Sequence, residues 1–131
     1  MHNVTLSSRT ALIVEDNQLT LELLAHVLED AGFQTTAVAR GSAAMALLTE
    51  QRFDLLLVDV YLPDMNGLVI CDMARERHRE RIVILVMSGP EIERWGVTAL
   101  QVCADDYLGK PFRLDDLITR IESKLRRTPE D

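Results

Sequence analysis

The sequence has few cysteines and no long apolar run. Cys71 and Cys103 are its only cysteines, and neither belongs to a Cys-x-x-Cys motif or to a cluster with histidine. We therefore expect two buried free thiols rather than a disulfide or a metal site. No stretch approaches the roughly 20 apolar residues that a membrane-spanning helix needs, and residues 1–9 contain no apolar signal-peptide core. These absences predict a cytoplasmic protein.

Positive charge is also scarce. The chain has 14 lysines and arginines against 21 aspartates and glutamates, so its net charge is −7. A basic surface of the kind that binds nucleic acid is therefore not expected. Lys124, Arg126 and Arg127 are too few for one, and they suit the carboxyl end of a helix. We expect no direct binding of this domain to nucleic acid or to a membrane.

What the sequence does contain is a regular alternation of two patterns. Short apolar runs typical of buried strands are separated by segments with the spacing of amphipathic helices. The predicted strands are 10–14, 33–39, 55–58, 82–87 and 106–108, of which 33–39 is partly polar. The predicted helices run from a cap at Asp16 or Asn17 to Gly32, from a cap at Ser42 to about 51, over 67–78 and 91–102, and through a last helix striped by Leu114, Leu117, Ile118, Ile121 and Leu125.

Five strand–helix pairs of this kind predict an α/β fold. We expect a (βα)₅ doubly wound, five-stranded parallel sheet with helices on both faces and the flavodoxin-like strand order 2-1-3-4-5. No linker-like segment divides the chain. The predicted organisation is one domain over 9–127, a flexible tail at 1–8, and a second tail or the start of a linker at 128–131.

Polar residues follow four of the predicted strands. Glu15 and Asp16 come after the first, Asp59 after the third, Ser88 after the fourth and Lys110 after the fifth. In the 2-1-3-4-5 order these four strands are neighbours, and ligands of such sheets bind outside the carboxyl ends of the strands. The sequence therefore predicts that these side chains converge at one edge.

The chemistry of this set favours phosphoryl transfer. Three close carboxylates repel one another, and a bound Mg²⁺, which prefers oxygen ligands, would offset that repulsion. Mg²⁺, Lys110 and the Ser88 hydroxyl could each neutralise one phosphoryl oxygen, while a carboxylate attacks phosphorus to form an acyl phosphate. Asp59 is the predicted nucleophile because it leaves a rigid buried strand at the centre.

In this order, the motifs resemble those of the CheY-like receiver domains of bacterial two-component response regulators. The resemblance covers residues 9–126. It rests on the Glu15-Asp16 pair, Asp59 after an apolar run, the Pro-Asp-Met-Asn-Gly turn at 63–67, Ser88, and Lys110-Pro111. It implies a phospho-acceptor of a two-component phosphorelay, which catalyses only its own phosphorylation and dephosphorylation and is not an enzyme on outside substrates.

The resemblance also implies residue roles. Asp59 would take the phosphoryl group from a sensor histidine kinase or a histidine phosphotransfer protein. Asp16 and Asp59 would bind Mg²⁺ directly, Glu15 largely through water, and the Tyr61 backbone carbonyl would complete the shell. Lys110 would bind a phosphoryl oxygen, with a cis peptide bond to the next residue.

A switch follows from the same resemblance. Ser88 would move toward the phosphoryl group and Tyr107 would move inward behind it. An output partner or a second copy of the chain would then bind the face formed by the fourth helix, the last strand and the last helix. Gly89 stands where the family commonly has alanine, and Pro90 comes next, which puts the usual motion of this loop in question.

Other interpretations stay open at this point. Asp59 could cap a turn, Ser88 could cap the next helix, and Tyr107 could be a half-buried edge residue without a switching role. The chain could be the receiver part of a larger DNA-binding regulator or hybrid kinase. A magnesium-dependent aspartyl phosphatase of the haloacid-dehalogenase type would need a second aspartate where Tyr61 stands. A flavodoxin-like module would place phosphate against Glu15 and Asp16, which would repel it.

Overall fold

The predicted apolar runs form the strands of the computed structural model, which describes residues 9–90 and 92–127. The predicted tails, 1–8 and 128–131, lie outside the described residues. The elements in chain order are β1 (Thr10–Val14), α2 (Gln18–Asp30), β2 (Gln34–Val38), α3 (Gly41–Glu50), β3 (Leu55–Asp59), α4 (Gly67–His78), the 3₁₀ helix η1 (Arg79–Arg81), β4 (Val83–Ser88), α5 (Ile92–Val102), β5 (Asp106–Gly109) and α6 (Leu114–Arg127).

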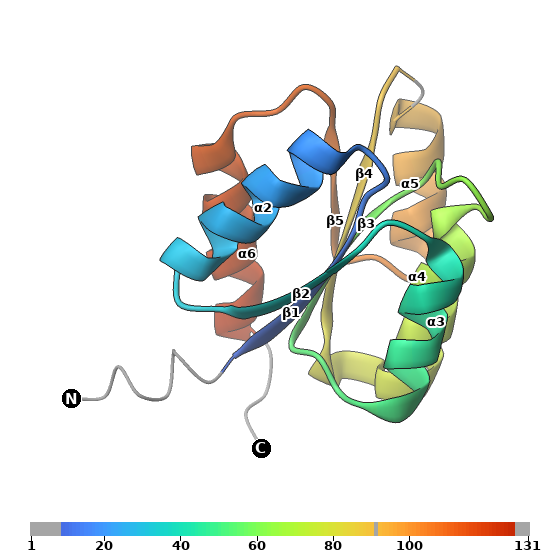
Figure 1. The fold of residues 1–131 in the computed structure, drawn as a ribbon. Coiled ribbons are helices and arrows are strands. Elements are labelled where there is room, and N and C mark those ends of the chain that lie inside the picture. Colours follow the sequence, from blue (N-terminus) through green and yellow to red (C-terminus); the bar gives the residue numbers. More distant parts are fainter. Residues whose placement is uncertain (1–8, 91, 128–131) are drawn as a thin grey trace.

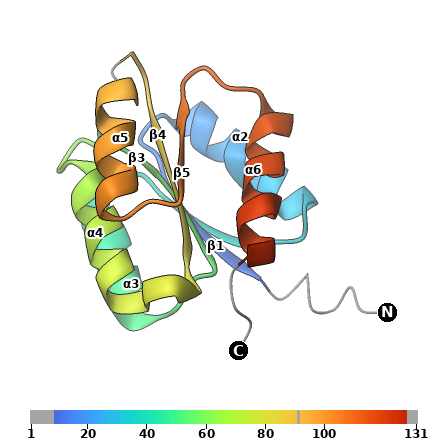
Figure 2. The ribbon, with the colours of Figure 1, turned by 180° about the vertical axis from the view of Figure 1, so that it is seen from behind.

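The sheet has the predicted architecture. Its five strands are parallel and lie in the order β2-β1-β3-β4-β5. Helices α2 and α6 cover one face, and α3, α4 and α5 cover the other (Figures 1 and 2). Among the described residues, no helix combines the length and the apolar character needed to cross a bilayer.

The central strand β3 is apolar from Leu55 to Val58 because it is buried on both faces. Leu55 and Leu57 pack on the side of α2 and α6, whereas Leu56 and Val58 pack on the side of α3, α4 and α5. All five residues of β3 are buried. A strand covered by helices on both faces has no solvent side, so the alternation of apolar and polar residues disappears.

Helix α2 ends as predicted, but α3 does not begin as predicted. The Asn17 side chain caps α2 by accepting from the Thr20 N–H (3.0 Å), and Gly32 follows the helix with φ 103°. The prediction that Ser42 caps α3 is wrong. The carboxylate of Asp64, far along the chain, accepts instead from the backbone N–H groups of Gly41 (2.8 Å) and Ser42 (2.9 Å).

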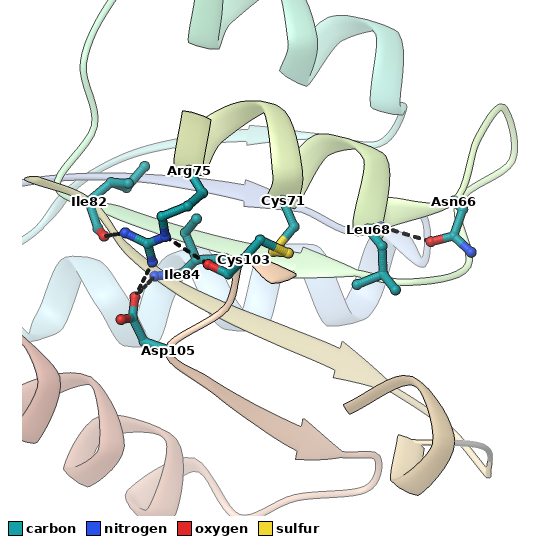
Figure 3. The surroundings of a disulfide bond; sticks show 8 residues. All are labelled: Asn66, Leu68, Cys71, Arg75, Ile82, Ile84, Cys103 and Asp105. Carbon is teal, nitrogen blue, oxygen red and sulfur yellow. Dashed lines mark hydrogen bonds and ion pairs between the residues drawn. A yellow bond between two sulfur atoms is a disulfide. The ribbon is translucent and has the colours of Figure 1, made fainter. Parts of the chain in front are cut away.

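The prediction of free thiols is also wrong. Cys71, in α4, and Cys103, just after α5, are buried as expected, but they form a disulfide with their Cα atoms 5.7 Å apart (Figure 3). The two residues are 32 positions apart, and no local motif pairs them. Only the packing of α4 beside the end of α5 brings them together, which a pattern of neighbouring residues cannot reveal.

Candidate functional site

The register of the sheet places the predicted residues side by side. Val14 pairs with Val58, so the residues that follow them, Glu15 and Asp59, are neighbours. Asp59 pairs in turn with Met87, and Ser88 pairs with Gly109. The carboxyl ends of β1, β3, β4 and β5 therefore bring one polar residue each to the same edge of the sheet.

Three carboxylates meet at this edge. One oxygen each from Glu15, Asp16 and Asp59 lie within 4.8 Å of one another, close enough to share a metal ion. Glu15 and Asp59 are only 1% and 5% exposed, whereas Asp16 is exposed and opens the cluster to solvent. The predicted convergence of these residues is thus observed, and the donors are hard oxygens of the kind that Mg²⁺ prefers.

Lys110 neutralises part of this negative charge. Its Nζ lies 2.6 Å from Glu15 Oε1 and 2.6 Å from Asp59 Oδ2. Burial lowers the pKa of the Lys110 ammonium, but the hydrogen bonds to Asp59 and Glu15 outweigh that effect and the pKa is raised. Burial raises the pKa of the Glu15 carboxyl, against the opposing hydrogen bond from Lys110. The peptide bond from Lys110 to Pro111 is cis, as the resemblance implied.

Ser88 contributes a buried hydroxyl to this edge of the sheet. It is the last residue of β4, it is 0% exposed, and its Oγ has no hydrogen-bond partner among the described residues. The structure therefore gives no support to Ser88 as the cap of α5. Leaving such a group unsatisfied costs about 1–3 kcal/mol. An orphan donor beside an acidic cluster fits a site whose ligand carries acceptor oxygens.

The loop after β3 holds Asp59 in place. The Tyr61 N–H donates to Asp59 Oδ1 (3.2 Å), so Asp59 does shape its turn as well as join the cluster. Gly67, which the sequence marked only as a turn and helix start, approaches the strand closely. A Cβ atom there would lie 2.0 Å from the carbonyl oxygen of Asp59, so only glycine fits without displacing the backbone.

Tyr61 and Tyr107 lie on the side of the site that faces α5. The Tyr61 hydroxyl accepts from Trp95 Nε1 (2.7 Å), and the two rings meet edge to face. Tyr107 is half-buried in β5 and packs against the core below α3, α4 and α5. Sequence reasoning missed the pairing of Tyr61 with Trp95, because 34 residues separate them and no local pattern pairs their side chains.

The sequence matches the model of the response regulator receiver domain family over residues 11–122. The transcriptional regulatory protein GltR of Pseudomonas aeruginosa is 40% identical over 92% of this chain and 50% of its own length. The DNA-binding response regulator MtrA of Mycolicibacterium smegmatis is 36% identical over 92% of this chain and 52% of its own. The chain thus spans about half the length of the curated relatives it matches.

Solved structures agree with these matches. The receiver domain of the TMAO respiratory system response regulator TorR superposes with a TM-score of 0.84 at 30% identity, covering 93% of this chain and all of that one (100%). A CheY-like receiver domain protein from Methanospirillum hungatei gives a TM-score of 0.85 at 28% identity, covering 91% of this chain and 94% of that one. Fold, motif order and sequence similarity therefore agree, and the chain belongs to the response regulator receiver domain family.

Proposed function

We propose that Asp59 is the phospho-acceptor of this receiver domain and that its phosphorylation depends on Mg²⁺. The observation that carries the proposal is the group of four side chains around it. Glu15, Asp16 and Lys110 contact or neighbour the Asp59 carboxylate, and the orphan hydroxyl of Ser88 ends the adjacent strand. This set combines a nucleophile, anion-stabilising groups and a candidate metal site.

The carboxylate oxygens of Asp59 have different surroundings. Oδ1 accepts from the Tyr61 N–H, and Oδ2 lies against the Lys110 ammonium. We propose that an Asp59 oxygen attacks the phosphorus of a phosphohistidine on a sensor kinase or a phosphotransfer protein. The new bond joins oxygen to phosphorus, the bond from phosphorus to the histidine nitrogen breaks, and the imidazole keeps that electron pair.

The other residues would stabilise the transferred group. Lys110, which bridges Glu15 and Asp59, would turn its ammonium to one phosphoryl oxygen, and Ser88 would donate its hydroxyl hydrogen to another. Asp16, Asp59, the Tyr61 carbonyl and, through water, Glu15 would hold Mg²⁺. When bound, Mg²⁺ supplies positive charge for the third oxygen. On this proposal the domain acts on itself and is not an enzyme on an outside substrate.

Partners and location are part of the same proposal. The upstream partner is a histidine kinase or a histidine phosphotransfer protein, and the domain works in the cytoplasm. Downstream, we propose that phosphorylation moves Ser88 and Tyr107 and alters the surface formed by α5, β5 and α6, which binds an output partner or a second copy.

A second candidate keeps this chemistry within a longer protein. GltR is named a transcriptional regulatory protein and MtrA a DNA-binding response regulator, and each is about twice as long as the segment it shares with this chain. Their names favour a receiver that controls a DNA-binding domain. The match to the receiver family leaves the phosphatase and flavodoxin-like alternatives without support.

The acceptor is tested with acetyl phosphate and Mg²⁺. We expect one phosphoryl group to be added, as read by intact mass, with the lability to alkali of an acyl phosphate. Asp59→Asn should abolish it, and a metal chelator should suppress it. Asp72→Asn, which neutralises an exposed carboxylate of α4, is the matched control and should label normally. Full labelling of the Asp59→Asn variant would contradict the assignment.

A further inference from the structure

The disulfide joins two elements that are otherwise separate in the chain. Cys71 lies in the second turn of α4 and is 0% exposed, and Cys103 follows α5 directly and is 4% exposed. Their Cα separation of 5.7 Å is within the usual range for disulfides. Figure 3 shows the bond between α4 and the turn that leads from α5 into β5.

The same turn is held by a second, independent set of contacts. Arg75, one helical turn after Cys71, donates from Nε to the Cys103 carbonyl (2.8 Å) and from Nη2 to Asp105 Oδ2 (2.6 Å). Asp105 also accepts from the Ile84 N–H (2.8 Å), which ties the turn to β4 (Figure 3). These hydrogen bonds do not involve the sulfur atoms, so they are available to hold the turn when the disulfide is reduced. Breaking the bond is compatible with a folded chain.

The bond matters most for α5. At its amino end, α5 is joined by a short loop to Ser88, whose buried hydroxyl has no hydrogen-bond partner in the part of the chain that the structure describes. At its carboxyl end it is joined to Cys103. If the loop after Ser88 moves when the phosphoryl site fills, α5 must turn about its carboxyl end. A covalent bond to α4 at the carboxyl end restrains this rotation of α5, whereas two separate thiols leave it unrestrained.

We propose that Cys71 and Cys103 form a reversible thiol–disulfide site, which takes small disulfides of the glutathione class and limits the movement of α5 when oxidised. A disulfide in a cytoplasmic protein is more often transient or redox-sensing than structural. The regulatory half of this proposal rests on the proposed function of Asp59, and the thiol–disulfide half rests on the proposed cytoplasmic location alone.

The reaction is a pair of thiol–disulfide exchanges. The Cys103 thiolate attacks one sulfur of glutathione disulfide, which forms a mixed disulfide and releases one glutathione. The Cys71 thiolate then attacks the Cys103 sulfur, and the second glutathione leaves. The two thiol protons go to the two departing thiolates, so the protein loses two electrons and glutathione disulfide gains them. Cys103 reacts first because it is the less buried of the two.

Thiol trapping tests the site itself. The full chain is equilibrated in glutathione buffers of increasing oxidation, quenched with acid, unfolded and alkylated, and its intact mass is measured. We expect both thiols to be lost together and to return with dithiothreitol. Cys71→Ala and Cys103→Ala should instead gain one glutathione, with Cys103 reacting faster when it is the thiol that remains. Urea unfolding checks that both variants are folded.

The regulatory half is tested by comparing oxidised and reduced protein. Beryllofluoride with Mg²⁺ serves as the probe of the phosphoryl site, and amide shifts along α5 and the fluorescence of Trp95, the single tryptophan, report the response. We expect the shifts in α5 to be at least twofold smaller in the oxidised protein. The double variant Cys71→Ala/Cys103→Ala, which has no thiol to oxidise, should respond equally in either buffer.

Three outcomes would overturn the proposal, and they are distinguishable. If both thiols stay free even in glutathione disulfide without added reduced glutathione, the assignment of a redox site is wrong. If the disulfide forms but the amide shifts that beryllofluoride induces in α5 are the same in oxidised and reduced protein, the proposed regulation is wrong. A disulfide that forms in a protein with no beryllofluoride response in either state would overturn the proposed function of Asp59 and the regulation with it.

Discussion

The two faces of the sheet are held in different ways. On the side of α2 and α6 the contacts are mainly apolar, and the ion pair of Arg120 with Asp106 lies at the partly exposed rim. The other side also has an apolar core, but directional links are added to it. Asp64 caps α3, Arg75 holds the turn after α5, and the disulfide joins that turn to α4.

The difference separates stability from positioning. Apolar burial is non-directional, so it stabilises the fold without fixing how far a helix can slide or turn. Hydrogen bonds and covalent links have set geometries and fix particular atoms. Most of the links named above lie on the side of α3, α4 and α5, and α5 is the helix that starts just after Ser88. We infer that one face mainly stabilises the domain and the other also sets the position of the site.

The largest effect is expected from a matched pair in β3. Leu56 and Leu57 are both 0% exposed and point to opposite faces. Leu56→Ala and Leu57→Ala should each lower the free energy of unfolding by about 2–5 kcal/mol, measured in urea. Only Leu56→Ala should also change the amide shifts that beryllofluoride induces in α5. Equal changes in both variants would contradict the division between the faces.

A smaller effect is expected from two arginines, one for each face. Arg75→Ala should destabilise by about 1–3 kcal/mol, because it removes the donor to the Cys103 carbonyl and leaves the Asp105 carboxylate with the Ile84 N–H but without its charged partner. Arg120→Ala should cost under about 1 kcal/mol, since its partners Asp106 and Asp116 lie near solvent. Urea unfolding measures the free energy of unfolding of both variants. A larger decrease for Arg120→Ala than for Arg75→Ala would contradict the proposed difference between the two faces.

The smallest effect concerns the cap on α3. Hydrogen bonds from the backbone N–H groups of Ser42 and Gly41 lower the pKa of Asp64 below its usual 3.8. A pKa lowered on folding contributes stability that is full above the unfolded value and is lost as the pH falls through the folded one. The stability gap between wild type and Asp64→Asn should therefore be constant above about pH 5 and should close at lower pH. A gap that does not change down to pH 2 would contradict a role for the charge.

The sequence predicted what depends on local pattern and topology. Apolar runs located β1, β3 and β4, and the alternation with helices located the more polar edge strands β2 and β5. The strand order then placed Glu15, Asp59, Ser88 and Lys110 at one edge. The sequence did not predict contacts between distant segments that depend on how a helix packs against its neighbours. The cap of α3 by Asp64, the disulfide and the hydrogen bond between Tyr61 and Trp95 all join residues more than 20 positions apart.

The course of α6 has a consequence for any domain attached after it. The helix runs back along the sheet from the edge that holds Asp59 (Figures 1 and 2). Arg126, near its end, and Arg9, which precedes β1, line the same pocket. The five residues of β3 alone span roughly 16 Å. Charge in solution is screened over about 8 Å at physiological ionic strength. A domain joined to α6 would therefore sense the phosphoryl group through shifts in packing rather than through its electric field.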